Sequence, residues 1–203
     1  EPSPHLKREL ILAAREYARV SDALLVSDYG YGAASPAILD SIRERGRLDR
    51  IPVVVDSRFR MLEYSGVVAA TPNEPEVEEA LGLQIGNDWS RLCSAGEELM
   101  SRMKLESLVI TRGRDGMVAF TAKHKPVDIP IFGSDQVADV TGAGDTVIAT
   151  FTAALAAGAN TEEAAYLANY AGGIVVMKRG TATVSQAELL RAMEQAPPVT
   201  RPH

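Results

Sequence analysis

Cysteine, histidine and tryptophan are scarce in this sequence, and their scarcity excludes several classes of protein. There is one cysteine, one tryptophan and three histidines in 203 residues. The lone Cys93 cannot form an internal disulfide framework, and no cluster of Cys and His residues has the spacing of a zinc site. We therefore expect a protein of a reducing compartment, and assign it to the cytoplasm.

Long apolar runs and clusters of basic residues are also missing. No stretch approaches the roughly 18 uninterrupted apolar residues of a membrane span, and the N-terminus lacks the basic and apolar regions of a signal peptide. Basic residues number 21 and acidic residues 27, which gives a net charge of −6. Because the basic residues are scattered, we expect neither a membrane nor a nucleic acid as the main partner.

Several nucleotide-binding motifs are absent as well. The sequence has no G-x-x-x-x-G-K-S/T loop and no H-R-D or D-F-G element, which argues against the P-loop and protein-kinase routes to phosphoryl transfer. No G-x-G-x-x-G string follows the first predicted strand, which disfavours a dinucleotide-dependent dehydrogenase.

Short apolar strands alternate with helical segments through the first half of the chain. This alternation is typical of a parallel sheet covered on both faces, because each parallel pair of strands needs a crossover connection. The pattern predicts an α/β fold in one domain over residues 1–203. The expected strands are 23–26, 51–55, 67–70 and 108–110, and the expected helices are 36–45, ended by Gly46, 73–81 and 88–103.

The second half of the chain changes character. Segments 117–121 and 126–131 are close enough to form an antiparallel edge of the sheet. Two alanine-rich helices are expected at 143–157 and 162–177, where small side chains would let them approach closely. A last helix at 186–195 begins after Ser185 and is stopped by Pro197-Pro198.

Polar side chains follow four of the predicted strands. Asp28, Asp56, Asn73 and Thr111 each come within three residues of the end of an apolar strand. Ligands of open α/β sheets bind outside the carboxyl ends of the strands. We therefore expect these four residues to face one rim of the sheet.

The string Asp139-Val140-Thr141-Gly142-Ala143-Gly144-Asp145 precedes a long apolar helix. Gly142 and Gly144 let the backbone approach a ligand, and free amides at a helix start attract an anion. A carboxylate at Asp145 would lie beside a phosphate bound there and could accept a proton from an attacking hydroxyl. The simpler alternative is a tight turn followed by an acid that favours the helix dipole.

This string resembles the D-T-x-G-A-G-D signature of the ribokinase/PfkB carbohydrate kinases, with Val140 in place of the usual Thr. The resemblance implies a ribokinase-like three-layer α/β/α fold with a mainly parallel sheet. It also implies that Asp145 is the catalytic base and that the amides of Gly142, Ala143 and Gly144 form the anion hole. ATP and Mg²⁺ would be required, and a monovalent cation is left open.

Other segments resemble the family in order and spacing. Asn73 and Glu76 resemble the N-x-x-E motif, which helps to place Mg²⁺, through water, and the nucleotide phosphates. Taken alone, Glu76 is an ordinary acid of a first helical turn. The nucleotide-binding residues implied by the resemblance are Asn73, Glu76, Thr111, Gly113, Gly116, Thr141 and Asn169, although Thr111 to Gly116 alone would read as a hairpin turn and Asn169 as a packing or capping residue.

The strings Ser27-Asp28-Tyr29-Gly30-Tyr31-Gly32, Asp56-Ser57-Arg58 and Thr71-Pro72-Asn73 follow three of the predicted strands. They resemble the corresponding loops of the heptose 7-phosphate kinases of bacterial ADP-heptose synthesis, a branch of the family that phosphorylates O1. Asp28 and Arg58 are the residues implied to contact the sugar substrate. Two departures stand out: Tyr31 replaces a basic residue, and Ser57-Arg58 replaces Pro-Lys. The resemblance covers the C-terminal two-thirds of the family pattern, so the N-terminal strands, the β lid and the dimer contact of the lid fall outside it.

Three interpretations remain open at this point. The first is a kinase, or part of one, that transfers the γ-phosphoryl group of ATP to heptose 7-phosphate or a similar sugar. The second is a related kinase with another acceptor, such as ribose, fructose, a nucleoside or a tagatose-type phosphate. The third is a nucleotide-binding module that has lost catalysis. The sequence does not decide whether a nucleotidyltransferase is fused beyond His203.

Overall fold

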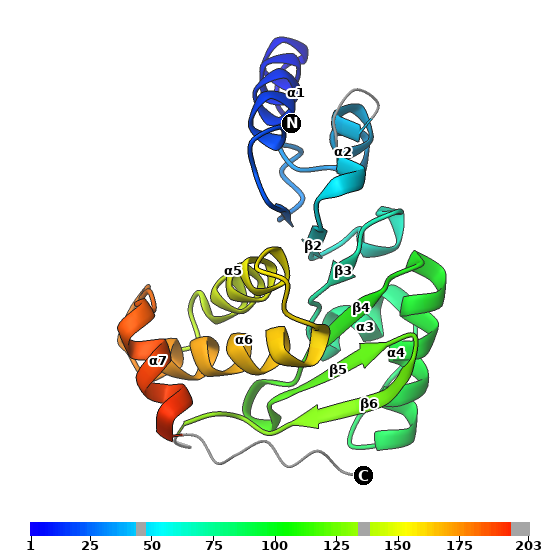
Figure 1. Ribbon diagram of the computed structural model, residues 1–203. Coiled ribbons are helices and arrows are strands. Elements are labelled where there is room, and N and C mark those ends of the chain that lie inside the picture. Colours follow the sequence, from blue (N-terminus) through cyan, green and yellow to red (C-terminus); the bar gives the residue numbers. More distant parts are fainter. Residues whose placement is uncertain (44–47, 134–138, 196–203) are drawn as a thin grey trace.

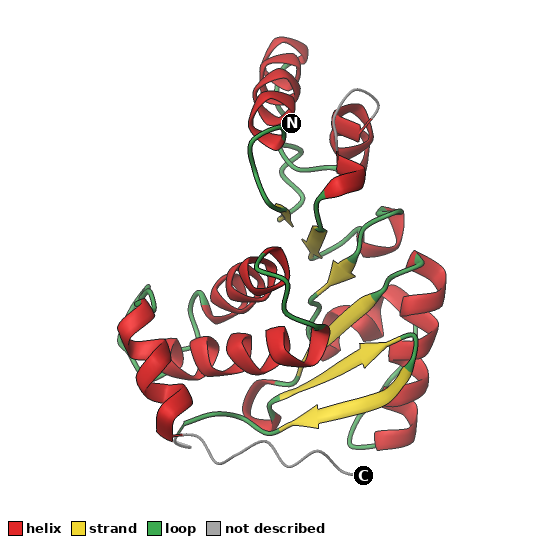
Figure 2. Ribbon diagram, viewed as in Figure 1, coloured by secondary structure: helices red, strands yellow, loops and turns green. Residues whose placement is uncertain are grey.

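A computed structural model describes residues 1–43, 48–133 and 139–195 of the chain. Six strands form one sheet in the order β1-β2-β3-β4-β5-β6, with helices on both faces (Figures 1 and 2). The strands are β1 (Leu24–Asp28), β2 (Val53–Ser57), β3 (Ala69–Ala70), β4 (Ser107–Thr111), β5 (Met117–Thr121) and β6 (His124–Ile129). The α-helices are α1 (Pro4–Ala18), α2 (Pro36–Arg43), α3 (Glu74–Leu81), α4 (Trp89–Met103), α5 (Ala143–Ala156), α6 (Thr161–Val176) and α7 (Gln186–Gln195).

The sheet is mainly parallel, as the sequence predicted. Strands β1 to β4 run parallel to one another, whereas β4 pairs antiparallel with β5 and β5 with β6. The predicted α/β class and the predicted antiparallel edge are both confirmed. Among the described residues, no helix is long and apolar enough to cross a membrane.

Several strand boundaries differ from the prediction. The strand expected at 23–26 is Leu24–Asp28, and the one expected at 51–55 is Val53–Ser57. The parallel ladder continues past the apolar residues, because Asp28 still pairs with Ser57. Asp28, Asp56 and Thr111 therefore belong to the ends of their strands and do not follow them. The predicted helix end at Gly46 and the stop at Pro197-Pro198 lie outside the described residues.

Alternation along the strands divides the core between the two faces of the sheet. Val53 and Val55 pack with α1, α2, α3 and α4, whereas Val54 between them packs with α5 and α6. Leu108, Val109 and Ile110 alternate in the same way on β4. Each fully buried side chain of this size contributes about 1.5–3 kcal/mol to folding, so a central strand buried on both faces explains the unbroken apolar runs of the sequence.

Helices α5 and α6 pack closely against each other and cover one face of the sheet (Figure 1). The buried residues of α6 are mostly small, and Ala164, Ala165 and Ala168 are fully buried. A Cβ atom at Gly172 would lie 2.9 Å from Val147 of α5. The predicted close approach of the alanine-rich helices is confirmed, and it holds the N-terminus of α5 near the ends of the strands.

Candidate functional site

A cavity of about 550 Å³ lies at the carboxyl ends of β1, β2, β3 and β4, beside the N-terminus of α5. Asp28, Asp56, Asn73 and Thr111 all line it, which confirms that the polar ends of the four strands share one rim. The other lining residues are Ser27, Tyr29, Arg58, Thr71, Glu76, Val140, Thr141, Gly142, Gly144 and Asp145. The parallel sheet thus gathers groups that are more than a hundred residues apart in the sequence.

The loop before α5 is built around Asp139 and Gly142. Gly142 is the N-cap of α5 with φ of +79°, a conformation that favours glycine. The Asp139 carboxylate accepts hydrogen bonds from the amides of Thr141 (2.9 Å) and Gly180 (3.2 Å). Hydrogen bonds from the side chain and backbone of Thr141 lower the pKa of Asp139. Asp139 therefore ties the loop to the segment after α6.

The three amides predicted to form the anion hole differ in whether they already donate a hydrogen bond within the protein. The amide of Ala143 donates to the carbonyl of Val140 at 3.2 Å, which closes the turn. Among the described residues, the other two predicted amides, of Gly142 and Gly144, have no hydrogen-bond partner, and neither does the amide of Asp145, which was not predicted to take part. An anion at this helix start could meet these amides directly, whereas Ala143 would have to share its proton.

Asp145 lies in the first turn of α5, with its side chain at the cavity. Its Oδ1 atom accepts a hydrogen bond of 2.7 Å from the hydroxyl of Tyr29, which comes from the loop after β1. This contact joins the two opposite walls of the cavity.

Asn73 and Glu76 form a reciprocal capping box at the start of α3. The side chain of Asn73 accepts from the amide of Glu76, and the Glu76 carboxylate accepts from the amide of Asn73, both at 2.9 Å. Both residues also line the cavity. The structure thus shows the capping role that the sequence alone suggested for Glu76, at a position from which the same side chains reach the cavity.

The carboxylates of Asp56, Glu76 and Asp145 all line the first cavity. Burial, together with the charges of Glu76 and Asp145, raises the pKa of Asp56 to about 7. Burial also raises the pKa of Glu76, against the hydrogen bonds at Asn73. Oxygen atoms crowded in this way are the ligands that Mg²⁺ prefers, usually with water between. No group of three His, Cys, Asp or Glu residues among those described is close enough to hold a metal ion by itself.

A second cavity, of about 190 Å³, adjoins the first between the β4–β5 connection, α5 and α6. Thr111, Gly113, Gly116 and Asn169 line it, so the structure brings together four residues predicted to contact the nucleotide. Gly116 has φ of +81°, and a Cβ there would lie 2.1 Å from the carbonyl oxygen of Ile129.

Asn169 and Gly144 define two walls of this second cavity. Asn169 is 5% exposed and donates to the carbonyl of Pro130 at 2.8 Å. Gly144 borders both cavities, and a Cβ there would meet no atom within 4 Å. The start of α5 therefore lies where the two cavities meet. Of these two cavities, Thr141 lines only the first.

The two residues predicted to bind the sugar have different surroundings. Asp28 is 4% exposed and accepts hydrogen bonds from Arg60 (2.9 Å), Tyr64 (2.8 Å) and the amide of Gly30 (2.9 Å). Burial opposes ionisation, but these bonds still lower the pKa of Asp28. Arg58 lines the first cavity, and its guanidinium lies over the ring of Tyr29, 5.7 Å from the ring centroid.

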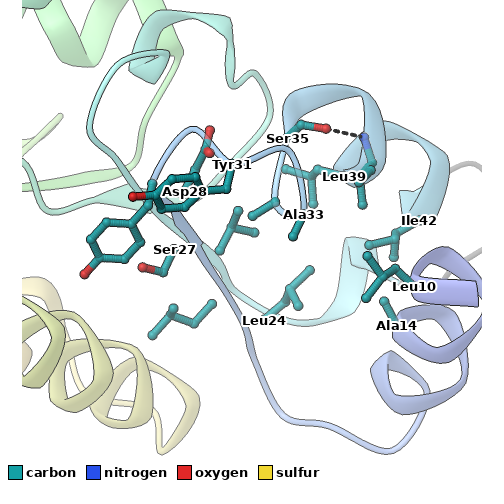
Figure 3. A pocket seen from close by; sticks show the side chains of 15 residues that line it. Leu10, Ala14, Leu24, Ser27, Asp28, Tyr31, Ala33, Ser35, Leu39 and Ile42 are labelled. Atoms are coloured by element: carbon teal, nitrogen blue, oxygen red, sulfur yellow. Dashed lines mark hydrogen bonds between the residues drawn. The ribbon is translucent and has the colours of Figure 1, made fainter. Parts of the chain in front are cut away.

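Another cavity, of about 450 Å³, lies between α1, β1 and α2 (Figure 3). Its walls are mainly apolar, with Leu10, Leu24 and Leu39 among them, and the hydroxyl of Ser35 caps α2 by accepting from the amide of Ile38. Asp28 is the only predicted site residue that borders it, so we assign it no part in the chemistry.

Sequence reasoning missed Tyr29 and Arg60, and it placed Asp56 at the rim without assigning it a role. Tyr29 stands in the loop after the first predicted strand, but nothing local assigns it a role. Arg60, which pairs with Asp28, carries no sequence signal because its partner lies 32 residues away.

Comparisons with known proteins agree with this geometry. The model of a family described as "pfkB family carbohydrate kinase" matches residues 3–188. The bifunctional protein HldE of Geobacter metallireducens is 44% identical over 180 residues, and that of Geobacter sulfurreducens is 40% identical over 194 residues. These matches cover 88% and 95% of this chain but 36% and 39% of the relatives, so the chain spans less than two fifths of their length.

Solved structures share the fold at low sequence identity. An Arabidopsis thaliana ribokinase complexed with ribose and ATP has a TM-score of 0.77 at 21% identity, covering 93% of this chain and 59% of that one. An Escherichia coli phosphofructokinase-2 in complex with potassium has a TM-score of 0.77 at 18% identity, covering 93% of this chain and 61% of that one. The ribokinase-like architecture expected from the sequence is confirmed.

Proposed function

Because this chain belongs to the pfkB family of carbohydrate kinases, we propose that it forms the nucleotide-binding and catalytic part of an ATP-dependent sugar kinase, as one α/β domain. The phosphoryl acceptor is a hydroxyl group of a sugar or sugar phosphate. The observation that carries this proposal is the position of Gly144 and Asp145, where the cavity lined by the carboxylates meets the cavity lined by Gly113, Gly116 and Asn169.

The roles of the residues follow from this arrangement. The nucleotide lies along Thr111, Gly113 and Gly116, so that its terminal phosphate reaches the start of α5. The amides there stabilise charge on the transferring group, and Asp145 accepts the proton of the attacking hydroxyl. The reaction joins the acceptor oxygen to the phosphorus, breaks the bond to the leaving ADP oxygen, and leaves the proton on Asp145.

The surroundings of Asn73 and Glu76 suit a magnesium ion held through water. Their side chains border a cavity in which burial raises the pKa of two neighbouring carboxyls, so a cation would relieve an unfavourable concentration of negative charge. When bound, Mg²⁺ would neutralise charge on the phosphate oxygens. We further propose that a monovalent cation assists the reaction, that the protein is a homodimer and that the reaction takes place in the cytoplasm.

The acceptor that we propose is heptose 7-phosphate, phosphorylated at O1. The motifs after β1 and β2, the likeness to HldE proteins and the place of Arg58 in the cavity support it. A guanidinium is suited to phosphate oxygens because it offers several donors in one plane. The replacement of a basic residue by Tyr31 favours a second candidate, another sugar or nucleoside acceptor within the same reaction.

The test is conversion of ATP to ADP by the protein as its gene encodes it, with heptose 7-phosphate and a panel of sugars and nucleosides. We expect Asp145→Asn to lower kcat by about 10²- to 10⁴-fold, because the base is lost, while nucleotide binding is retained. Asp22→Asn, on an exposed loop, is the matched control. Equal rates for Asp145→Asn and wild type, or no turnover with any acceptor, would leave a nucleotide-binding module as the better interpretation.

A further inference from the structure

Tyr29 makes the contact with Asp145 on which this inference rests. Its hydroxyl donates to Oδ1 of Asp145 at 2.7 Å, and the two residues lie 116 positions apart in the sequence. One residue comes from the loop after β1 and the other from the first turn of α5, so the contact depends on how the two walls of the cavity are assembled.

The backbone on either side of Tyr29 is firmly held. Asp28, just before it, is buried and bonded by Arg60 and Tyr64. Gly30, just after it, has φ of +80° and donates its amide to Asp28 Oδ1 at 2.9 Å. The buried carboxylate therefore fixes the turn that aims Tyr29 at the cavity.

The ring of Tyr29 is held in the same direction. The guanidinium of Arg58 lies 5.7 Å from the ring centroid, a distance typical of a cation-π contact. The side chain is 43% exposed and lines the cavity with Asp145 and Asp56. The ring is thus only partly buried, whereas its polar end has a defined partner.

We propose that Tyr29 is a positioning residue for Asp145: its hydroxyl fixes one carboxylate oxygen, so that the other is directed at the acceptor hydroxyl. The inference rests on the proposed function, in which Asp145 is the base. A carboxylate rotates readily about its last side-chain bond, and a hydrogen bond to Oδ1 restricts that rotation. Oδ2 then takes the proton from the acceptor as the new oxygen–phosphorus bond forms and the ADP oxygen leaves with its electron pair.

Tyr29 keeps its own proton throughout this step. The hydrogen bond to Asp145 raises the pKa of Tyr29 from its ordinary value, and burial and the charges of Asp145 and Asp56 add to the effect. Arg58 is the cation that faces the ring. At neutral pH the phenol is therefore a donor, and it orients the carboxylate without exchanging a proton with it.

The kinetic test compares Tyr29→Phe with wild type in the protein as its gene encodes it. We expect kcat to fall by about 10- to 100-fold, the size of effect that a misplaced catalytic group produces, with KM for ATP and for the acceptor changed less than about 2-fold. Tyr17→Phe removes a hydroxyl from the exposed face of α1 and is the matched control, with wild-type kinetics expected. Thermal melting of each variant shows whether it is folded.

The outcomes separate this inference from the proposed function. If Asp145→Asn keeps its activity, the proposed base is wrong. If Asp145→Asn is inactive while Tyr29→Phe has the wild-type kcat, this inference alone is overturned. A Tyr29→Phe enzyme with lower KM and unchanged kcat also overturns it, since the hydroxyl would then merely occupy the place of the acceptor.

A spectroscopic titration tests the contact even if no acceptor is found. The phenolate signal that is present in wild type and missing in Tyr29→Phe belongs to Tyr29. We expect that signal to appear at lower pH in Asp145→Asn, because the hydrogen bond and charge that raise the pKa of Tyr29 are reduced. An unchanged titration in Asp145→Asn would show that the two side chains do not interact, and would overturn the inference.

Discussion

Asp56 combines two features at the scale of the single residue: it lies within a buried strand, and its carboxyl faces other acids. Its pKa is raised to about 7, first by burial and then by Glu76 and Asp145. In the unfolded chain an aspartate ionises near pH 4. Between pH 4 and 7 the folded protein therefore holds a proton that the unfolded chain has lost, and the free energy of unfolding falls as pH rises.

We predict that Asp56→Asn, which resembles the protonated acid, flattens this pH dependence. At pH 8 and without Mg²⁺ or nucleotide, the variant should be more stable than wild type by about 1–2 kcal/mol, or roughly 2–8 °C in Tm. At pH 4 the two proteins should melt alike. Asp22→Asn, on an exposed loop, is the control for loss of one charge, and parallel curves for Asp56→Asn and wild type would contradict the prediction.

At the scale of the element, glycine has opposite roles in α5 and α6. A Cβ at Gly173 in α6 would lie 2.1 Å from the carbonyl oxygen of Phe132, so the helix can pack there only without a side chain. A Cβ at Gly144 in the first turn of α5 would point into open space between the two cavities. Gly173 is required for packing, whereas Gly144 borders open space between the two cavities.

We predict that Gly173→Ala and Gly144→Ala have different effects. Gly173→Ala should cost about 1–3 kcal/mol, because backbone atoms must move to accept the methyl group. Gly144→Ala should leave Tm unchanged or slightly raised, since alanine favours a helix, yet lower the affinity for ATP. Melting curves and nucleotide titrations measure both effects. Equal stability of the two variants would contradict the assignment.

At the scale of the whole molecule, the parallel strands β1 to β4 bring their carboxyl ends to one edge, and α5 delivers its N-terminus there. The β5–β6 hairpin extends the sheet beside α6 and lies near the second cavity through Met117. A nucleotide bound across both cavities would contact strands, loops and helices that separate on unfolding. Binding should therefore stabilise the fold as a unit.

We predict that ATP with Mg²⁺, at about 100 times its dissociation constant, stabilises the protein by about 2.7 kcal/mol, which corresponds to a rise of roughly 5–10 °C in Tm. Addition of EDTA should remove part of this rise, because the magnesium ion that we propose near Asn73 and Glu76 would be removed. ATP with EDTA and Mg²⁺ alone are the controls. The absence of any shift with ATP and Mg²⁺ would contradict nucleotide binding at this site.

Local patterns were sufficient to predict much of this protein. The α/β class, the antiparallel edge and the close-packed helices follow from the spacing of apolar and small residues within single elements. The loop from Asp139 to Asp145 was also predictable as a turn into a helix, because the helix start and its glycines lie within a few residues, and its use as an anion site stays a prediction. Boundaries were less accurate, since ladder hydrogen bonds extend beyond the apolar residues to Asp28 and Ser57.

The tertiary structure decided what depends on distant partners. It paired Tyr29 with Asp145 and Arg60 with Asp28, and it showed that the amide of Ala143 already bonds to Val140. These contacts depend on strand register and on the angle at which α5 meets the sheet, and neither is encoded by any one segment. The sequence by itself determined which groups are candidates for the chemistry, because these occur in local motifs. The fold determined which of them meet, because burial and charge act between elements far apart in the chain.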